Sequence, residues 1–255
     1  MTTSEVLKTG DGARTLARGL LLLELVADSP PGVGVSELAA KSGLDKGTVS
    51  RLLATLRQCG YVRQSPGDRH YSLSAKTTRL SHAYLTQLDL RGVARPFLWR
   101  LREEVGETIH LAIREGTRIV YVDQLEPDRA VRHSSAVGQI LPLHVTAMGR
   151  ALLVAMKPVD RDEMLALLLG ERRYDDFVGD GDRLFEELAD AARRGWATVD
   201  RRDDVIRIGA AIVDGLGEPL GAMSISGPSY RIADRMDELG QRCREVAADV
   251  GHAFG

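Results

Sequence analysis

Cysteine is scarce in this chain: Cys59 and Cys243 are the two in 255 residues, and they lie in different halves. Two isolated cysteines exclude a disulfide framework and a CxxC metal site, and they suit a reducing compartment. Long apolar runs are lacking too, because no uninterrupted apolar stretch approaches the length of about 20 residues that a membrane span needs. The N-terminus has neither the basic patch nor the apolar run of a secretory signal. We therefore expect a cytoplasmic protein that makes no membrane contact.

Motifs for catalysis are lacking as well. The six histidines are scattered, no HExxH or GxSxG motif occurs, and no serine or cysteine lies in a nucleophile setting. The glycine-rich stretch 215–219 is expected to be a turn between strands, because no helix is predicted after it. His144 is the best catalytic candidate, although a structural or pocket-lining role is commoner for such a histidine. We expect no catalytic residue, no metal site and no cofactor.

The net charge of −2 conceals an uneven distribution. Between Glu37 and Arg79 the chain carries eight basic and three acidic residues, a net charge of +5, which leaves −7 for the rest. A basic module on an acidic body is the pattern expected when one domain meets phosphate and the other does not. A chance cluster on a solvated face would give the same count, so the motifs must decide between the two.

A first helix is predicted near the N-terminus. An apolar stripe at helical spacing predicts that this helix is mostly buried and ends near Asp28, before a Pro-Pro-Gly stop at 30–32. The stripe consists of Leu16, Leu20, Leu23 and Ala27, and it is widened by Leu22, Leu25 and Val26.

Two further helices joined by a tight turn are predicted next. Ser36 is placed to cap a short helix over 37–42, and Gly43 is placed to end it in a left-handed conformation. Asp45 is the expected N-cap of the following helix, which runs from Lys46 to about Cys59.

The second of these helices is predicted to read DNA. Its apolar face repeats at i, i+3, i+4 and i+7, and its opposite face is small and able to donate hydrogen bonds, which is typical of a helix that enters the major groove. A plain amphipathic helix is the general alternative, against which the short preceding helix, the glycine turn and the local charge weigh. The residues predicted to contact DNA from this helix are Lys46, Gly47, Thr48, Ser50 and Arg51.

A β-hairpin is predicted after Gly60. Residues 61–64 and 69–73 alternate with a period of two around a turn at 65–68. Arg63 and Arg69 are expected to lie along phosphates or in the minor groove, where they position the protein rather than specify a sequence. The N-terminal region is therefore predicted to be a winged helix-turn-helix domain.

The rest of the chain predicts mixed helices and strands. A linker helix over about 75–90, with an apolar stripe that includes Leu80 and Tyr84, is followed by a helix over 93–104 with Pro96 in its first turn. Strands are expected at 108–113, 119–122, 130–133, 206–213 and 220–226, and helices at 146–156, 183–194 and 231–253. This order predicts an α+β layer, in which helices cover an antiparallel sheet.

Polar residues of the last strands fit either a carboxylate receptor or an ordinary structural role. Ser224 and Ser226 project on one face of their strand, and Arg207 reaches the same place if the two C-terminal strands pair. An arginine beside hydroxyls and the N–H groups of a helix start is a carboxylate receptor. The alternative is that the serines bond backbone groups and Arg207 forms a surface ion pair with Asp203 or Asp204. The residues that bracket the helix start are Leu141, Leu143, Ala147 and Met148.

The stretch LAAKSGLDKGTVSRLL at 38–53 resembles the helix-turn-helix of the IclR family of bacterial regulators. The resemblance continues in order through LDLRGVARPFLWRL, VGETIHLAI, VYVDQLE, GQILPLHVTAMGRALL and SISGP, and it covers nearly the whole chain. Gly47 and Ser50 replace a more usual serine and histidine, and Arg207 stands where a cysteine is more usual. An added positive charge at that position favours a more anionic ligand.

The resemblance implies a division of labour along the chain. Residues 1–74 would form the winged helix-turn-helix domain, 75–91 a linker helix, and 92–255 a GAF-like domain that binds a small organic acid. The effector pocket would include the positions of Ala147, Met148, Arg207, Ser224 and Ser226, beside Leu141 and Leu143. Binding of this acid would modulate binding to double-stranded operator DNA, and the regulator would be a homodimer or a dimer of dimers.

Two other classes of protein stay open. An enzyme that metabolises a small acid and carries an appended DNA-binding domain is the main alternative, and turnover of such an acid would reveal it. A DNA-architectural protein without a ligand is the other alternative, and no metabolite would stabilise it against heat.

Overall fold

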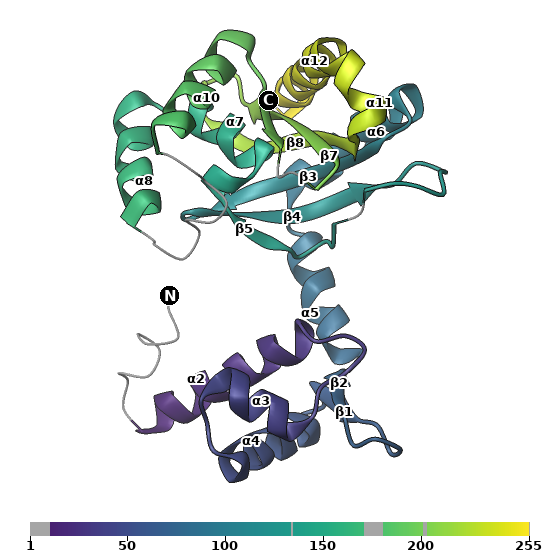
Figure 1. Cartoon of the computed structure of the whole chain (residues 1–255), viewed down its shortest axis with the longest axis vertical. Coiled ribbons are helices and arrows are strands. Elements are labelled where there is room, and N and C mark those ends of the chain that lie inside the picture. Colours follow the sequence, from purple (N-terminus) through teal and green to yellow (C-terminus); the bar gives the residue numbers. More distant parts are fainter. Residues whose placement is uncertain (1–10, 134, 171–180, 201–202, 255) are drawn as a thin grey trace. The chain divides into compact units, whose positions relative to one another are not determined.

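The chain divides into two compact units that meet between Gln87 and Leu88. The structure is a computed structural model, and it describes residues 11–133, 135–170, 181–200 and 203–254. Figure 1 shows a mainly helical N-terminal unit and a C-terminal unit built around a sheet. Each unit has its own hydrophobic core, so each is described by itself.

The N-terminal unit packs three helices against a small hairpin, and a fourth helix follows the hairpin. Its elements are α2 (Asp11–Ala27), α3 (Val35–Ser42), α4 (Lys46–Gln58), β1 (Val62–Gln64), β2 (Tyr71–Leu73) and α5 (Lys76–Leu85). Strands β1 and β2 pair antiparallel, and Val33 forms a bridge to Tyr71 that brings the turn before α3 alongside the hairpin. The buried core is Leu22, Val26, Val33, Leu38, Val49, Leu53, Val62 and Tyr71.

Two details of the predicted helices in this unit are wrong. Leu16 and Leu20 of α2 are 66% and 50% exposed, whereas Leu22 and Val26 are buried. Because residues 20–23 are all leucine, two neighbouring faces of α2 are apolar. Packing against α3 and α4 buries the face that contains Leu22 and Val26. Ser36 is not an N-cap, because α3 begins at Val35 after an extended Gly34.

The linker helix is shorter and more exposed than predicted. Helix α5 ends at Leu85 rather than near residue 90, and none of its residues, all of which the structure describes, is buried. Leu80 and Tyr84 are 51% and 44% exposed. The apolar stripe is therefore present on α5 but is not covered within the described part of the chain.

The C-terminal unit contains a six-stranded antiparallel sheet in the order β5-β4-β3-β8-β7-β6. The strands are β3 (Thr108–Glu115), β4 (Arg118–Leu125), β5 (Ile140–Pro142), β6 (Ala197–Asp200), β7 (Val205–Val213) and β8 (Pro219–Pro228). The helices are α6 (Asp89–Val105), η1 (Leu143–Val145), α7 (Ala147–Ala155), α8 (Pro158–Gly170), α10 (Gly181–Arg194), α11 (Ser229–Ile232), η3 (Ala233–Arg235) and α12 (Met236–Phe254). The predicted α+β class with an antiparallel sheet is confirmed.

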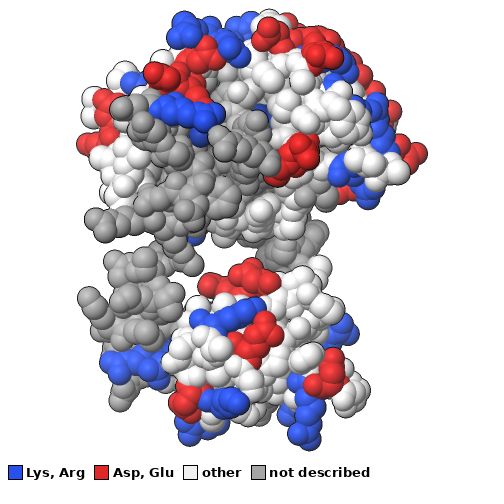
Figure 2. Space-filling view, in the orientation of Figure 1, with Lys and Arg blue, Asp and Glu red and all other residues white. Residues whose placement is uncertain are grey.

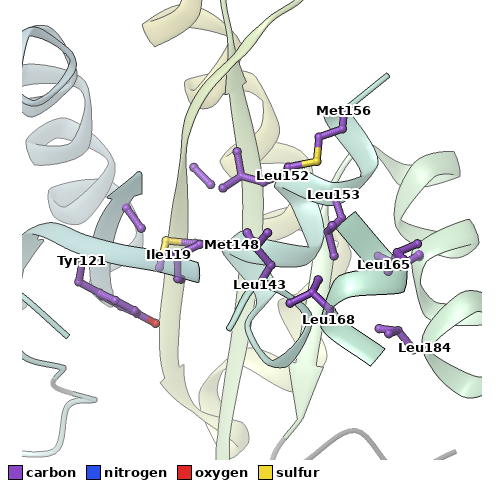
Figure 3. Packing of buried hydrophobic residues seen from close by; sticks show 13 residues of the cluster. Ile119, Tyr121, Leu143, Met148, Leu152, Leu153, Met156, Leu165, Leu168 and Leu184 are labelled. Atoms are coloured by element: carbon purple, nitrogen blue, oxygen red, sulfur yellow. The ribbon is translucent and has the colours of Figure 1, made fainter. Parts of the chain in front are cut away.

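Helices cover both faces of this sheet. Helix α7 packs on β7 from one side, with α8 and α10 outside it, and α6 and α12 pack on the other side (Figure 1). Figure 3 shows Met148 and Leu152 of α7 between the sheet residue Ile119 and the outer residues Leu165 and Leu184. This packing holds the start of α7 against the sheet, where the candidate ligand site lies.

Three predictions for this unit need correction. Residues 130–133 form a loop rather than a strand, because side chains take their backbone oxygens: Thr108 donates to the His133 oxygen at 2.6 Å, and Arg231 donates to the Val131 oxygen at 3.0 Å. Pro96 lies in the interior of α6, since the helix begins at Asp89 rather than Val93. The short strands β5 and β6 and helix α8 were not predicted.

No helix formed by the described residues is long and apolar enough to cross a membrane.

Candidate DNA interface and candidate effector site

The turn between α3 and α4 is built by two residues with distinct backbone roles. Gly43 has a φ of 70°, and its N–H donates to the Ala39 oxygen at 3.0 Å, which closes α3. Asp45 is extended and accepts a hydrogen bond from the Thr48 N–H at 2.9 Å, which opens α4. Hydrogen bonds from Thr48 hold the pKa of the Asp45 carboxyl below its ordinary value. The predicted glycine turn and aspartate cap are both confirmed.

Helix α4 presents the predicted DNA-contacting residues to solvent. Val49 and Leu53 are buried in the core, and the opposite face carries Arg51, whose Nη2 donates to the Thr48 hydroxyl at 3.3 Å. This bond orients the guanidinium along the exposed face of the helix. Thr48 is half-buried, and the exposed residues of this face are Lys46, Gly47, Ser50 and Arg51.

The hairpin loop is longer than predicted. The Ser65 N–H donates to the His70 oxygen at 2.8 Å and the Arg69 N–H to the Ser65 oxygen at 3.2 Å, so Arg69 belongs to the loop rather than to the strand. Arg69 has a φ of 58°, a left-handed conformation that ends strand geometry. Both Arg63 and Arg69 are exposed, and Arg63 donates to the Ser72 hydroxyl at 3.1 Å.

A hydrogen-bonded chain joins the hairpin loop to helix α4. Arg57 donates through Nη1 to the Gln64 side-chain oxygen at 3.2 Å, and Gln64 donates through Nε2 to the Arg69 oxygen at 3.1 Å. Sequence reasoning missed Arg57 and Gln64, because their pairing joins a helix to a strand. Figure 2 shows Lys and Arg side chains along the edge of the N-terminal unit where Figure 1 places α4 and the hairpin.

The C-terminal sheet carries a buried polar face beneath α7. In the strand pairing, Ser226 lies between Thr108 of β3 and Arg207 of β7, and Ser224 lies between His110 and Gly209. Since side chains alternate along a strand, these residues share one face of the sheet. All five polar residues are buried: Thr108, His110, Arg207, Ser224 and Ser226.

Gly209 brings the start of α7 onto this face. A Cβ at position 209 would lie 2.5 Å from the Ala147 carbonyl carbon and 2.6 Å from the Met148 nitrogen, so only glycine allows this approach. Thr146 caps α7 by accepting from the Gly149 N–H at 2.9 Å. The N-terminal end of α7, with the positive end of its dipole, therefore lies next to Ser224 and its neighbours. Gly209 was not predicted.

The other predicted effector residues form the apolar part of this region. Leu143 and Met148 pack with Ile119 and Tyr121 in the core beneath α7 (Figure 3). Leu141 of β5 pairs with Ile119 and is partly buried against the same core. The structure thus brings the predicted set to one side of the sheet.

Arg207 is paired with an acidic residue of its own chain. Its Nη1 and Nη2 donate to the two carboxylate oxygens of Asp203 at 3.0 and 2.7 Å, and Nη1 also donates to the Val205 oxygen at 3.1 Å. The guanidinium holds the pKa of the Asp203 carboxyl below its ordinary value. The alternative of an ion pair with Asp203 is therefore correct as to the partner, but Arg207 is buried rather than on the surface.

His110 is a site residue that sequence reasoning missed. Its Nδ1 lies 3.4 Å from the Ser224 hydroxyl, and its ring contacts the Tyr121 and His133 rings edge to face. Burial, then the neighbouring His133 and Arg207, lower the pKa of His110 to about 3, so the ring is neutral. Its Nε2 is buried and has no hydrogen-bond partner among the described residues. The alternation of Thr108 and His110 with Ala112 was the signal that would have identified it.

Within the described ranges, no group of three or more His, Cys, Asp and Glu side chains is placed to hold a metal ion. His144, the best catalytic candidate, is buried in η1, where its backbone oxygen accepts from the Arg150 Nε at 2.7 Å.

A winged helix-turn-helix unit followed by an α+β unit with a buried polar face defines a two-domain, DNA-binding transcription regulator. Residues 15–66 match the model of the IclR helix-turn-helix domain, and residues 82–252 match that of the bacterial transcriptional regulator IclR C-terminal domain. The chain therefore belongs to the IclR family of bacterial transcriptional regulators, and it is a regulator rather than an enzyme.

Similar proteins cover nearly the whole chain. The transcriptional repressor IclR of Escherichia coli K12 is 32% identical over an alignment of 251 positions that covers 95% of this chain and 90% of the relative. The repressor AllR of the same strain is 33% identical over 96% of this chain and 91% of its own length. The crystal structure of an IclR-family regulator from Brucella abortus has a TM-score of 0.74 at 28% identity, covering 98% of this chain and 94% of that one.

Proposed function

We propose that this chain is a cytoplasmic repressor that binds operator DNA through α4 and the β1–β2 hairpin, and that a small organic acid bound beneath α7 modulates this binding. The observation that carries the proposal is the buried polar face of the C-terminal sheet, which supplies an arginine, hydroxyls and a helix N-terminus in one place. Its curated relatives are repressors, which favours this sign of regulation.

On the DNA side, the exposed face of α4 would read base edges. Arg51 is the residue we assign to a bidentate contact with a base, because its guanidinium is exposed and oriented by Thr48. Lys46, Gly47 and Ser50 would lie beside it, and Gly47 has no side chain to hinder a close approach. Arg63 and Arg69 of the hairpin would contact phosphates.

On the effector side, the donors of the polar face would bind a carboxylate. Ser224, Ser226 and the first N–H groups of α7 supply hydrogen bonds, and Arg207 supplies charge. The unpaired Nε2 of His110 would bond a polar substituent of the acid, since a buried nitrogen without a partner is costly. Leu141, Leu143, Ala147 and Met148 would enclose the apolar part of the ligand.

The regulator would act as a homodimer or a dimer of dimers. A single recognition helix reads few base pairs, and two-fold symmetry doubles the contact. The exposed leucines Leu16 and Leu20 of α2, with Leu80 and Tyr84 of α5, give the N-terminal unit apolar surface that a second copy would cover.

The test is fluorescence anisotropy at near-physiological salt, with the DNA upstream of the gene of this protein compared with a scrambled duplex. We expect a preference of roughly a thousandfold or more for the native DNA, and its reduction by at least one acid from a panel of small carboxylates. If the native DNA is not preferred, selection from a random duplex pool is the second test. If this selection also yields no preferred sequence, the proposed function is wrong.

A further inference from the structure

The guanidinium of Arg207 is buried, and a carboxylate from an exposed segment engages both of its terminal nitrogens. The Arg207 side chain is 9% exposed and that of Asp203 is 44% exposed. Both Asp203 oxygens accept from Arg207, in the two-pronged geometry that arginine forms with any carboxylate. The strongest donor group of the polar face is therefore occupied by an anion that belongs to the chain itself.

The position of Asp203 makes it a removable partner. Asp203 precedes β7, whereas Arg207 lies within this strand and is fixed opposite Ser226 by the pairing with β8. Asp203 therefore lies outside the strand pairing that fixes Arg207. Its carboxylate is partly exposed to solvent while it is bonded to Arg207. Loss of the pair would leave Asp203 hydrated, but it would leave the Arg207 charge buried unless another anion replaced the carboxylate.

We propose that Asp203 is an internal competitor for the carboxylate of the effector, which exchanges with it on Arg207. The proposal rests on the sensor function proposed above, in which a bound acid modulates DNA binding. It adds how the site sets its affinity for that acid. Two carboxylates on one guanidinium would repel each other at close range, which favours exchange over simultaneous binding. Asp203 therefore raises the concentration of acid needed to fill the site, and it selects anions over neutral isosteres.

The experiment uses the full-length chain and two matched aspartate variants. Asp203→Asn removes the competing charge, and Asp204→Asn removes the same charge one residue away, where the left-handed φ of 57° suits asparagine. The probe is sodium acetate, with acetamide as the neutral isostere and sodium chloride at equal ionic strength as the reference. The measurement is the acetate concentration that gives half of the maximal thermal stabilisation.

We expect Asp203→Asn to lower this concentration about tenfold relative to the natural chain, because it frees a charge-assisted pair of hydrogen bonds. Asp204→Asn should behave like the natural chain, acetamide should have no effect, and Arg207→Gln should remove the acetate response. A gain of equal size in both aspartate variants, or no response of Asp203→Asn to acetate, would overturn the proposal.

Operator binding separates this proposal from the function it rests on. The same proteins are titrated onto operator DNA with and without acetate, and each is checked by circular dichroism for native secondary structure. If Asp203→Asn binds acetate more tightly but acetate leaves the DNA affinity unchanged, the exchange of carboxylates on Arg207 is supported and the sensor function is wrong. DNA release by an acid with equal potency in the natural chain and Asp203→Asn would defeat exchange alone.

Discussion

The two units of this protein place their functional side chains in opposite environments. The N-terminal unit carries its polar residues on the outside of α4 and the hairpin, over an apolar core, whereas the C-terminal unit buries its polar residues between α7 and the sheet. Arg51 is exposed and Arg207 is buried, although both are assigned to bind an anionic partner. A surface arginine suits a large partner, because the partner itself displaces water from the guanidinium when it binds. A buried arginine suits a ligand that is small enough to be enclosed.

The contrast predicts different costs when each site is disturbed. Substitutions at the exposed site should change binding with little effect on folding, because the side chains are not part of the core. Substitutions in the buried face should change stability as well as binding.

The largest effect is expected from Gly209→Val. The new side chain would clash with backbone atoms of Ala147 and Met148, which cannot rotate away, so we expect a loss of about 3 kcal/mol in the free energy of unfolding of the C-terminal unit. The measurement is denaturant unfolding followed by circular dichroism. Gly92→Ala, on α6 with open space around it, is the matched control and should be neutral or slightly stabilising. Equal stability of the two variants would show that the start of α7 does not pack directly against Gly209.

Arg51→Ala should weaken specific DNA binding by about 2 kcal/mol while the free energy of unfolding stays within about 0.5 kcal/mol. The reason is that an exposed guanidinium contributes to base recognition but not to the core. Anisotropy with operator and random DNA measures the first quantity, and thermal unfolding the second. Equal losses on both DNAs would reassign Arg51 to a phosphate contact.

His110 should make the stability of the C-terminal unit depend on pH. Its pKa is lowered to about 3 in the folded protein by burial, by His133 and by Arg207, against the opposing effect of Glu126. As pH falls below about 6.5, His110 therefore becomes protonated in the unfolded state but stays neutral in the folded state. The free energy of unfolding should then drop by about 1.4 kcal/mol per pH unit. This contribution is constant above that pH.

Unfolding measured between pH 7 and 5 checks this expectation. His110→Gln keeps a polar side chain but cannot titrate, so its stability should fall less steeply than that of the natural chain. Parallel curves for the two proteins would contradict a neutral, buried His110.

The smallest effect is expected at the hairpin. Arg69→Ala should lower DNA affinity by less than about 1 kcal/mol, equally on specific and random DNA, and should reduce the salt slope by about one. Arg69→Lys retains the charge and should preserve the slope. A change in the preferred base sequence with either variant would show that the loop reads bases.

The sequence predicted the N-terminal unit better than the C-terminal site for a physical reason. Gly43 and Asp45 act on neighbouring residues, so their roles follow from local spacing, and the helix they define is confirmed. The predicted stripe on α2 was too wide because Leu16 and Leu22 are equally apolar, and only packing against α3 and α4 shows that Leu22 is buried and Leu16 is exposed.

The C-terminal site depends on contacts between distant strands. Alternation alone places Ser224 and Ser226 on one face of their strand, but His110 joins them only through the pairing of β3 with β8. Gly209 matters because α7 crosses it, which no local pattern signals. The loop at 130–133 was predicted as a strand from its local sequence, whereas Thr108 and Arg231 donate hydrogen bonds to its backbone oxygens.

The bonds from Arg57 through Gln64 to Arg69 have a consequence for how this protein diverges from its relatives. They tie the hairpin loop to helix α4, so under the proposed function the loop that contacts the DNA backbone and the helix that reads bases would approach the duplex as one unit. Substitutions at exposed positions of α4 such as Gly47 and Ser50 would then change which bases are recognised without changing the spacing between the base contacts and the backbone contacts. Under this proposal, single substitutions would give new operator preferences of unchanged length.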